Sequence, residues 1–299
     1  MAVSFRRVAL IGKPNSTEIA ASLAALSAFL RTRGCEVIVE METARAMGEG
    51  VSGSAFEDIG RSADLAVVLG GDGTMLSAAR LLARQHVPLT GVNQGRIGFM
   101  TDIGLGDMCI SLGKILDGEY VLEDRSLIDA EIVRAGKTVL RTVALNEAVI
   151  GKGAQGRLIE FDLTIDNEYV YTLRADGMIV STPTGSTAYA LSAQGPILHP
   201  SLPAFALVPL NPHTLSTRPV SVSDRSLIEI RLLKAADARV HLDGFALADL
   251  EEGDRLLLRR SADAIRFVHP PGYNYFAMLR GKLGWSERVD RTIRADDHA

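Results

Sequence analysis

The chain has 299 residues, of which 47% are hydrophobic, and its formal net charge is -4. This length fits one large or two ordinary domains, and the apolar content predicts a well-filled core, which excludes an extensively disordered protein. A protein that grips a nucleic-acid backbone usually carries an excess of basic residues, so the net charge argues against nucleic acid as a partner.

The cysteines and the apolar segments bear on where the protein works. Cys35 and Cys109 lie far apart and match no metal-ligand spacing, which favours two reduced thiols. The apolar run near the start ends at Gly12, too short for a secretory signal, and the run over 19–30 is too short to span a bilayer. We therefore expect a soluble, cytoplasmic protein with no membrane partner.

Strand-like and helix-like segments alternate over the first third of the chain. Short apolar runs predict strands over residues 7–12, 36–40, 64–69 and 87–93, and helical spacing predicts helices over 17–34 and 74–85. A polar, Gly-rich loop is expected after residue 40. Alternating β and α units are typical of a parallel sheet covered by helices.

From about Ser126 onward, strand-like runs are broken by Gly, Asn or Asp turns, and helical periodicity is nearly absent. This half of the chain is predicted to form an antiparallel β domain. Helical spacing returns over 273–285, in a tail expected to pack onto the first domain. The predicted organisation is an α/β domain over 1–125, a β-rich domain over 126–270 and a helical tail over 271–299.

The stretch DLAVVLGGDGTMLSAARLLA, residues 64 to 83, runs from a strand through three glycines and Asp72 into a helix. Backbone N–H groups at the start of such a helix bind phosphates, and glycines let a phosphate approach closely. Asp72 has the wrong charge for holding phosphate. It could cap the helix, accept a proton from an attacking hydroxyl, or hold Mg²⁺ that bridges phosphates. The last two uses point to phosphoryl transfer.

Neither of two glycine-rich sequence patterns for nucleotide binding supports a nucleotide site in this chain. The ATP-binding pattern G-x-x-x-x-G-K-[ST] is absent from the sequence. GKGAQG, residues 151–156, fits G-x-G-x-x-G, but a strand follows it where a dinucleotide site requires a helix. We interpret it as a turn between β segments.

Residues 179–200, IVSTPTGSTAYALSAQGPILHP, leave a strand, turn at Pro183 and Gly185, and enter a short helix. Their hydroxyl groups belong to Ser181, Thr182, Thr184, Ser186, Thr187, Tyr189 and Ser192. Hydroxyls at a helix start can cap it, but this density is too high for capping and suits a ligand rich in ribose and amide groups.

A second polar cluster, Asn146 and Glu147, lies inside the apolar run VALNEAVIGK (143–152). Adjacent strand residues point to opposite faces, and a buried carboxylate is costly unless paired. Either one side chain is accommodated on the less favourable face, or the strand is interrupted there. A bound ribose or base amino group would satisfy both side chains.

Six stretches together resemble bacterial NAD kinase, in its proteobacterial branch. They are GGDGT (70–74), NQGRIGFMTD (93–102), LNEAVI (145–150), DGMIVSTPTGSTAYALSAQGPI (176–197), PHTLSTRPV (212–220) and HPPGYNYFAMLRGKLGW (269–285). They occur in family order and cover most of the chain from residue 64. GGDGT is shared with diacylglycerol and sphingosine kinases and resembles the phosphofructokinase site, whereas TPTGSTAY together with NE is far more specific.

The resemblance implies ATP-dependent phosphorylation of NAD at the 2′-hydroxyl of the adenosine ribose, with a divalent metal, Mg²⁺, to give NADP. It implies an α/β N-terminal domain with a Rossmann-like parallel sheet and an antiparallel, β-sandwich-like C-terminal domain. A cleft would lie between them, and the assembly would be a homodimer or homotetramer. Whether polyphosphate also serves as donor is left open.

The resemblance also assigns roles by motif. Asp72 would accept the proton, Gly73 would belong to the phosphate-facing loop, and Asn146 and Glu147 would hold the adenosine side of NAD. The rest of the dinucleotide pocket would be lined by Asp176, Thr187, Ala188, Tyr189, Ala190, Leu191 and Ser192. Arg157 and Arg174 would be pyrophosphate partners, or else solvated strand residues.

One departure from the family pattern lies next to a further candidate, Asp243. Phe245 stands where relatives often carry glutamine, so an amide contact would be lost there and stacking would replace it.

Two functions other than that of an NAD kinase remain possible from the sequence. A lipid kinase would share the glycine loop but show a membrane-facing feature, which the sequence lacks, and a non-catalytic dinucleotide-binding module would have no use for Asp72.

Overall fold

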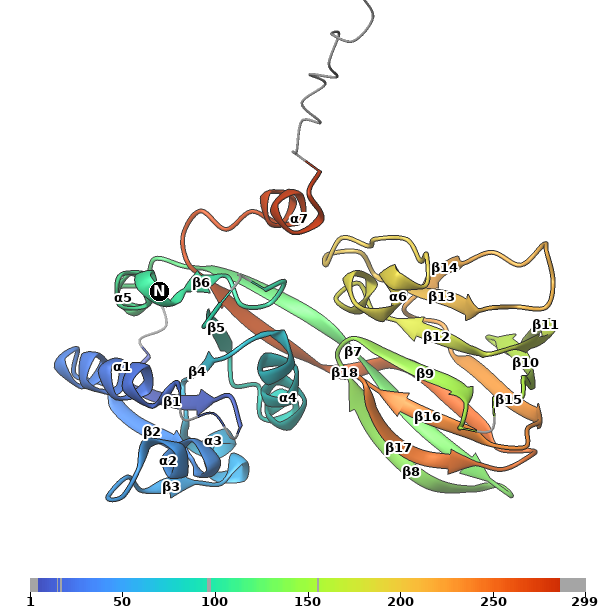
Figure 1. Cartoon of the computed structure of the whole chain (residues 1–299), viewed down its shortest axis with the longest axis horizontal. Coiled ribbons are helices and arrows are strands. Elements are labelled where there is room, and N and C mark those ends of the chain that lie inside the picture. The colour runs from blue at the N-terminus through green and yellow to red at the C-terminus, as the bar shows by residue number, and fades with distance from the viewer. Residues whose placement is uncertain (1–4, 15, 17, 96–97, 155, 286–299) are drawn as a thin grey trace, which may run out of the picture.

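The computed structural model describes residues 5–14, 16, 18–95, 98–154 and 156–285 (Figure 1). The N-terminal elements are β1 (Arg7–Gly12), α1 (Ala20–Thr32), β2 (Glu36–Glu40), α2 (Met41–Met47), β3 (Gly53–Ser54), α3 (Phe56–Ser62), β4 (Leu65–Leu69), α4 (Asp72–Leu82), η1 (Ala83–Gln85), β5 (Leu89–Asn93), β6 (Ile103–Gly104), η2 (Leu105–Asp107) and α5 (Met108–Leu116). The strands and helices predicted for this third are confirmed, with ends shifted by a few residues.

The N-terminal strands form a parallel sheet in the order β5-β4-β1-β2-β3. The apolar side chains of α1 and α5 pack on one face of this sheet. Those of α3 and α4 pack on the other. Parallel strands are buried by such helices on both faces, which explains the continuous apolar run of β4.

Two short helices occupy the region after residue 40, where the sequence predicts a polar, Gly-rich loop. The Glu40 carboxylate accepts the N–H groups of Glu42 and Thr43, both at 2.9 Å, and so caps α2. Gly48, at a φ of 108°, ends it. Helices of seven residues span about two turns, too short for apolar periodicity to show. The loop prediction is therefore wrong over α2 and α3.

The remaining elements are mostly strands, as the sequence predicts. They are β7 (Val121–Arg134), β8 (Lys137–Ala144), β9 (Glu147–Lys152), β10 (Ile159–Ile165), β11 (Glu168–Ala175), β12 (Gly177–Ser181), η3 (Gly185–Thr187), α6 (Tyr189–Ser192), β13 (Ala204–Leu210), β14 (Val220–Ser223), β15 (Ile228–Lys234), β16 (Ala238–Leu242), β17 (Phe245–Leu250), β18 (Arg255–His269) and α7 (Tyr275–Leu283). Gly151 and Lys152 of GKGAQG end β9, and the described residues from there to Ile159 belong to no helix or strand, in agreement with a connection between β segments.

The C-terminal part is a sandwich of two sheets. One is the antiparallel sheet β14-β13-β12-β9-β16-β17. The other contains β11, β10, β15, β18, β7 and β8. Phe161 of β10, Phe205 of β13 and Leu256 of β18 belong to the core between them. The fold class, an α/β part and an antiparallel sandwich, is confirmed.

Two long strands, β7 and β18, join the N-terminal α/β part to the C-terminal sandwich (Figure 1). β18 pairs with β15 and β7 in the sandwich, and its residue Phe267 pairs in parallel with Leu89 of β5. The parallel sheet and one sandwich sheet are therefore a single 12-stranded sheet. The helix of the tail, α7, reaches both parts. Its Tyr275 hydroxyl lies 3.4 Å from the Leu198 carbonyl oxygen, and Lys282 lies 5.9 Å from the Phe99 ring centroid.

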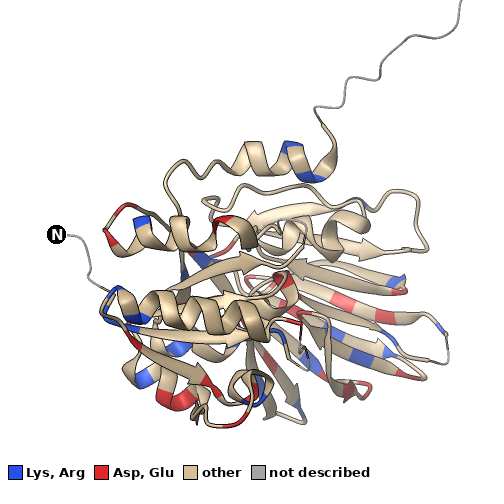
Figure 2. Ribbon diagram, turned by 60° about the vertical axis from the view of Figure 1, so that its left-hand side comes forward, with Lys and Arg blue, Asp and Glu red and all other residues tan. Residues whose placement is uncertain are grey.

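Residues of both charge signs are interspersed along the sandwich strands (Figure 2). Cross-strand ion pairs such as Arg141–Glu131, at 2.8 Å, and Arg255–Glu229, at 3.5 Å, account for part of this pattern. Among the described residues, no helix is both long enough and apolar enough to cross a bilayer.

Candidate active site

The glycine loop lies where the strand order of the parallel sheet reverses. β1 and β4 are neighbours in the sheet, and the Lys13 N–H donates to the Leu69 carbonyl at 3.0 Å. The carboxyl ends of such strands form the usual ligand crevice of open α/β sheets. A pocket of about 480 Å³ opens there, lined by Lys13, Gly71, Gly73, Thr74, Asn93 and Gly95, among others.

Asp72 is the first residue of α4, and its carboxylate points to a neighbouring segment. Oδ2 accepts the Phe99 N–H at 2.8 Å, and Oδ1 accepts the Met100 N–H at 3.0 Å and the Thr101 hydroxyl at 3.3 Å. Gly71 is the N-cap residue, and no side chain caps the helix. The helix-capping interpretation of Asp72 is therefore not what the structure shows.

Gly98 lets the 98–101 segment approach the carboxylate this closely. A Cβ atom at Gly98 would lie 1.9 Å from Oδ1 of Asp72 and 2.4 Å from Oγ1 of Thr101. Asn93 holds the same segment from the other side, because its Nδ2 donates to Oγ1 of Thr101 at 2.7 Å. The carboxylate is thus fixed before any substrate binds, which is the preorganisation that catalytic groups need.

A cavity of about 140 Å³ brings four of the sequence-predicted residues together: Asp72, Asn146, Thr187 and Ala188. Thr184, one of the hydroxyl residues named from the sequence, also lines it, and the structure adds five residues that the sequence reasoning did not single out: Phe99, Met100, Arg125, Tyr275 and Met278. All of these except Arg125 fall within the quoted motifs, whereas Arg125 lies outside them and carries no local spacing signal.

Asn146 and Glu147 lie at a break between strands, one of the two alternatives that the sequence leaves open. β8 ends at Ala144 and β9 begins at Glu147. The carboxylate of Asp243 fills the gap in the ladder, accepting the N–H groups of Asn146 at 2.7 Å and Glu147 at 3.2 Å. It also accepts the Leu145 N–H at 2.9 Å. Asp243 therefore positions the backbone of this pair.

Both side chains of the pair are buried and offer acceptor atoms to a ligand. Asn146 is 9% exposed and Glu147 5%. Within the described part of the chain, Oδ1 of Asn146 and Oε2 of Glu147 have no hydrogen-bond partner. Buried polar atoms are nearly always paired, so unpaired ones at a cavity indicate where a ligand donor would bind.

Glu147 and Asp243 form a buried pair of acids. Burial and the negative charge of Asp243 raise the pKa of Glu147 to about 8. Burial also raises the pKa of Asp243, although three backbone N–H groups and Arg80 oppose the shift. The Arg80 guanidinium connects this pair to the glycine-loop helix, since its Nε lies 3.5 Å from Oδ2 of Asp243. The guanidinium lies 5.3 Å from the ring centroid of the half-exposed Phe245.

A third pocket, of about 430 Å³, is lined by Glu147. It is also lined by Lys152, Asp176, Tyr189, Asn211 and His241. Asp176 accepts from Nζ of Lys152 at 2.6 Å and from Nδ2 of Asn211 at 2.8 Å. These two hydrogen bonds lower the pKa of Asp176. The adjacent residues Asn146 and Glu147 therefore line two different cavities, Asn146 the one with Asp72 and Glu147 this one.

Besides Asp243, five of the sequence-predicted residues line none of the three cavities described above. Ala190 is buried in the core beside Val149 and Val208, and Leu191 and Ser192 follow it on the short helix α6. Arg157 is exposed in the connection between β9 and β10. Arg174, on β11, lies 3.8 Å from Glu160 with a side chain 65% exposed.

The described residues contain no group of three or more His, Cys, Asp or Glu side chains arranged to hold a metal ion. Mg²⁺ is commonly bound by one or two carboxylates together with substrate phosphates and water. Asp72 fits this mode, because a carboxylate has about four acceptor positions and three are occupied.

Comparison with known proteins shows the family. The chain matches the model of the ATP-NAD kinase N-terminal domain over residues 8–120 and that of the ATP-NAD kinase C-terminal domain over 145–270. It is 56% identical over 288 residues to an NAD kinase of Aromatoleum aromaticum, covering 96% of each chain. An NAD kinase of an Azoarcus species is 55% identical, covering 96% of this chain and 98% of that one.

Solved structures agree. Yeast NADH kinase, crystallised with NADH, aligns with a TM-score of 0.88 over 99% of this chain and 91% of that one, and at 23% identity it supports the fold. An NAD kinase from Archaeoglobus fulgidus in complex with ATP aligns with a TM-score of 0.74 and 26% identity, over 93% of this chain and 98% of that one. The chain therefore belongs to the NAD kinase family of phosphotransferases.

Proposed function

We propose that the chain transfers the γ-phosphoryl group of ATP to the 2′-hydroxyl of the adenosine ribose of NAD, giving NADP, with Asp72 as proton acceptor. The single observation that carries this proposal is the placement of Asp72. Its carboxylate is held by three donors of the 98–101 segment and still lines the cavity that contains Asn146 and Thr187. The glycine-loop pocket adjoins it along the chain at Gly71 and Gly73.

The reaction makes one bond and breaks one. The 2′-oxygen attacks the γ-phosphorus in line, the bond from that phosphorus to the bridging oxygen breaks, and the electron pair leaves with ADP. Asp72 accepts the proton of the hydroxyl through its remaining acceptor position. The backbone N–H groups of the glycine loop face the transferring group and stabilise its charge.

Binding of NAD is assigned to the cavity lined by Asn146 and to the pocket lined by Glu147. The free acceptor atoms of Asn146 and Glu147 would take hydroxyl or amino hydrogens of the adenosine part. Thr187 and Ala188 would line that end, and Asp176 and Tyr189 would line the pocket beyond. Ala190, Leu191, Ser192, Arg157 and Arg174 remain predictions from the resemblance.

A divalent metal belongs to the reaction in this family, and we propose Mg²⁺. Bound with the phosphates of the donor, it would neutralise part of their charge. The donor phosphates and water would hold the metal, because the remaining acceptor position of Asp72 takes the proton of the hydroxyl. A homodimer or homotetramer in the cytoplasm, with no nucleic-acid partner, completes the proposal.

The test is to incubate the purified protein with NAD, ATP and Mg²⁺ and to detect NADP with an NADP-specific dehydrogenase. Parallel reactions replace NAD with diacylglycerol or sphingosine, and ATP with polyphosphate. We expect NADP formation and no lipid product. Lipid phosphorylation without NADP would favour the lipid kinase, and NAD binding without turnover would favour the non-catalytic binding module.

A further inference from the structure

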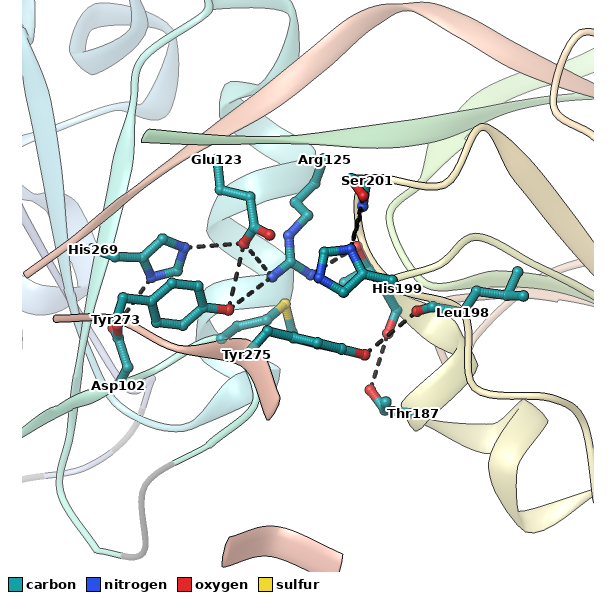
Figure 3. Close-up of polar contacts among 12 residues, drawn as sticks. Asp102, Glu123, Arg125, Thr187, Leu198, His199, Ser201, His269, Tyr273 and Tyr275 are labelled. Carbon is teal, nitrogen blue, oxygen red and sulfur yellow. Dashed lines mark hydrogen bonds and ion pairs between the residues drawn. The ribbon is translucent and has the colours of Figure 1, made fainter. Parts of the chain in front are cut away.

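The last residue of β18, His269, lies between two carboxylates from different parts of the chain. Its Nδ1 is 2.9 Å from Oδ2 of Asp102, and its Nε2 is 3.1 Å from Oε2 of Glu123 (Figure 3). The residue is 2% exposed. A carboxylate accepts hydrogen bonds, so both contacts are satisfied at once only by the imidazolium, which donates from both nitrogens.

The groups around the ring support its charged form. Burial opposes it, but the hydrogen bonds and charges of Asp102 and Glu123 outweigh burial and raise the pKa of His269. Arg125, also on β7, donates from Nη2 to Oε2 of Glu123 at 2.5 Å. From the chain that follows β18, the Tyr273 ring stacks on the imidazole at 3.7 Å between centroids. Two cations and two carboxylates therefore balance in a nearly closed site.

Asp102 connects this cluster to the catalytic carboxylate. It directly follows the 98–101 segment, whose Phe99 and Met100 N–H groups and Thr101 hydroxyl hold Asp72. Asn93 also holds the segment, because its Nδ2 donates to Oγ1 of Thr101. Its C-terminal end is held by the ion pair between Asp102 and His269, and β18 is anchored along its whole length by β7.

We propose that His269 is a positioning residue for the reaction: by holding Asp102 it fixes the 98–101 segment that holds Asp72. The inference rests on the role of Asp72 proposed above. It differs from a merely structural role, in which His269 would only anchor the tail that begins at Pro270. In that case its loss would lower stability without loosening the 98–101 segment.

Three variants separate these roles. His269→Gln keeps a polar side chain but cannot bridge two carboxylates as a cation. Asp102→Asn removes the negative charge of the same contact from its less buried partner, which guards against a His269 variant that fails to fold. His86→Gln is the control, because this histidine is exposed and pairs only with Asp263 at 3.7 Å among the contacts that the structure gives it.

The first readout is amide hydrogen exchange, which needs no activity. In His269→Gln and Asp102→Asn we expect the peptide that carries residues 98–102 to exchange about tenfold faster, while a peptide from β4 exchanges as in the wild type. The second readout is kinetic. We expect kcat to fall about 10- to 100-fold, with the KM for NAD within about threefold, because a small misplacement of a reacting group affects the chemical step. The double variant should be no worse than the more severe single one.

Unchanged exchange at 98–102 in both variants would overturn the inference, and so would additive losses in the double variant. Asp72→Asn is measured in parallel. If that variant keeps its turnover, the proposed role of Asp72 fails, whereas the exchange data still report whether His269 holds the segment. The two failures are thereby distinguishable.

Discussion

Arg80 and Asp243 join the helix that begins at Asp72 to the strands that carry Asn146 and Glu147. Nε of Arg80, on α4, lies 3.5 Å from Oδ2 of Asp243, whose side chain is fully buried. The same carboxylate accepts the N–H groups of Leu145, Asn146 and Glu147. One buried acid thus sets the distance between the proposed catalytic and ligand-binding groups.

Asp243→Ala should therefore destabilise the protein strongly. It leaves three buried backbone N–H groups without their acceptor, each at a cost of about 1–3 kcal/mol, and it removes the ion-pair partner of Arg80. Since such losses are not additive, we expect about 3–5 kcal/mol in chemical denaturation. Arg80→Met serves as the comparison, because it removes only the ion pair, and it should cost less. Equal losses in the two variants would show that the backbone contacts of Asp243 contribute little.

The raised pKa of Glu147 predicts how stability depends on pH. Its pKa is about 8 in the folded chain against an ordinary value of 4.5, so the folded state binds more protons between these values. The free energy of unfolding should then fall as pH rises through that window, by up to about 1.4 kcal/mol per pH unit. Glu147→Gln stays neutral at every pH and should lack this fall. Denaturant titrations of both proteins between pH 5 and 9 measure the difference, and parallel curves would contradict the prediction.

Glu147→Ala addresses ligand binding at the same position. Oε2 of Glu147 has no hydrogen-bond partner among the described residues, which leaves it available to a hydroxyl of NAD. Since the raised pKa keeps Glu147 mostly neutral at pH 7, losing this hydrogen bond costs about 0.5–1.5 kcal/mol, and the KM for NAD should rise about 2- to 10-fold. An unchanged KM in a folded variant would mean that Glu147 does not bind NAD and has only a structural role at the break between β8 and β9.

Asp72→Asn should reduce turnover about 10²–10⁴-fold, the usual contribution of a general base. The variant is not neutral for stability, because an amide has only one acceptor oxygen for the Phe99 and Met100 N–H groups. We expect a loss of about 1–3 kcal/mol. Asp58→Asn is the matched control: it removes an exposed first-turn carboxylate from α3, away from the cavity. Near-normal kcat in a folded Asp72→Asn protein would exclude Asp72 as the base.

Much of this site could be predicted from the sequence, because its chemistry is concentrated in short motifs. Strand and helix periods located the glycine loop, and the unusual pair Asn146–Glu147 left a break in the strand as one of two alternatives. What the sequence could not provide are contacts between segments far apart in the chain. Arg125 of β7 lines the cavity, and His269 contacts Asp102, from which it is 167 residues away in the sequence. No local spacing predicts such pairs, since they depend on how β7 and β18 cross the sheet.

Gly98→Ala is the sharpest test of how Asp72 is held. The new methyl group would lie 1.9 Å from Oδ1 of Asp72, so either the carboxylate or the 98–101 segment must move. We expect kcat to fall about 100-fold, as for a reacting group displaced by about 1 Å. Overpacking should lower stability by about 1–3 kcal/mol.

Gly106→Ala is the control for the same substitution, because a Cβ there meets no atom within 4 Å and the position has no left-handed φ. It should behave as the wild type in both kinetics and unfolding. If Gly98→Ala also kept its wild-type kcat, the close approach to Asp72 would be unnecessary for turnover. The carboxylate would then act from a position that the 98–101 segment does not set.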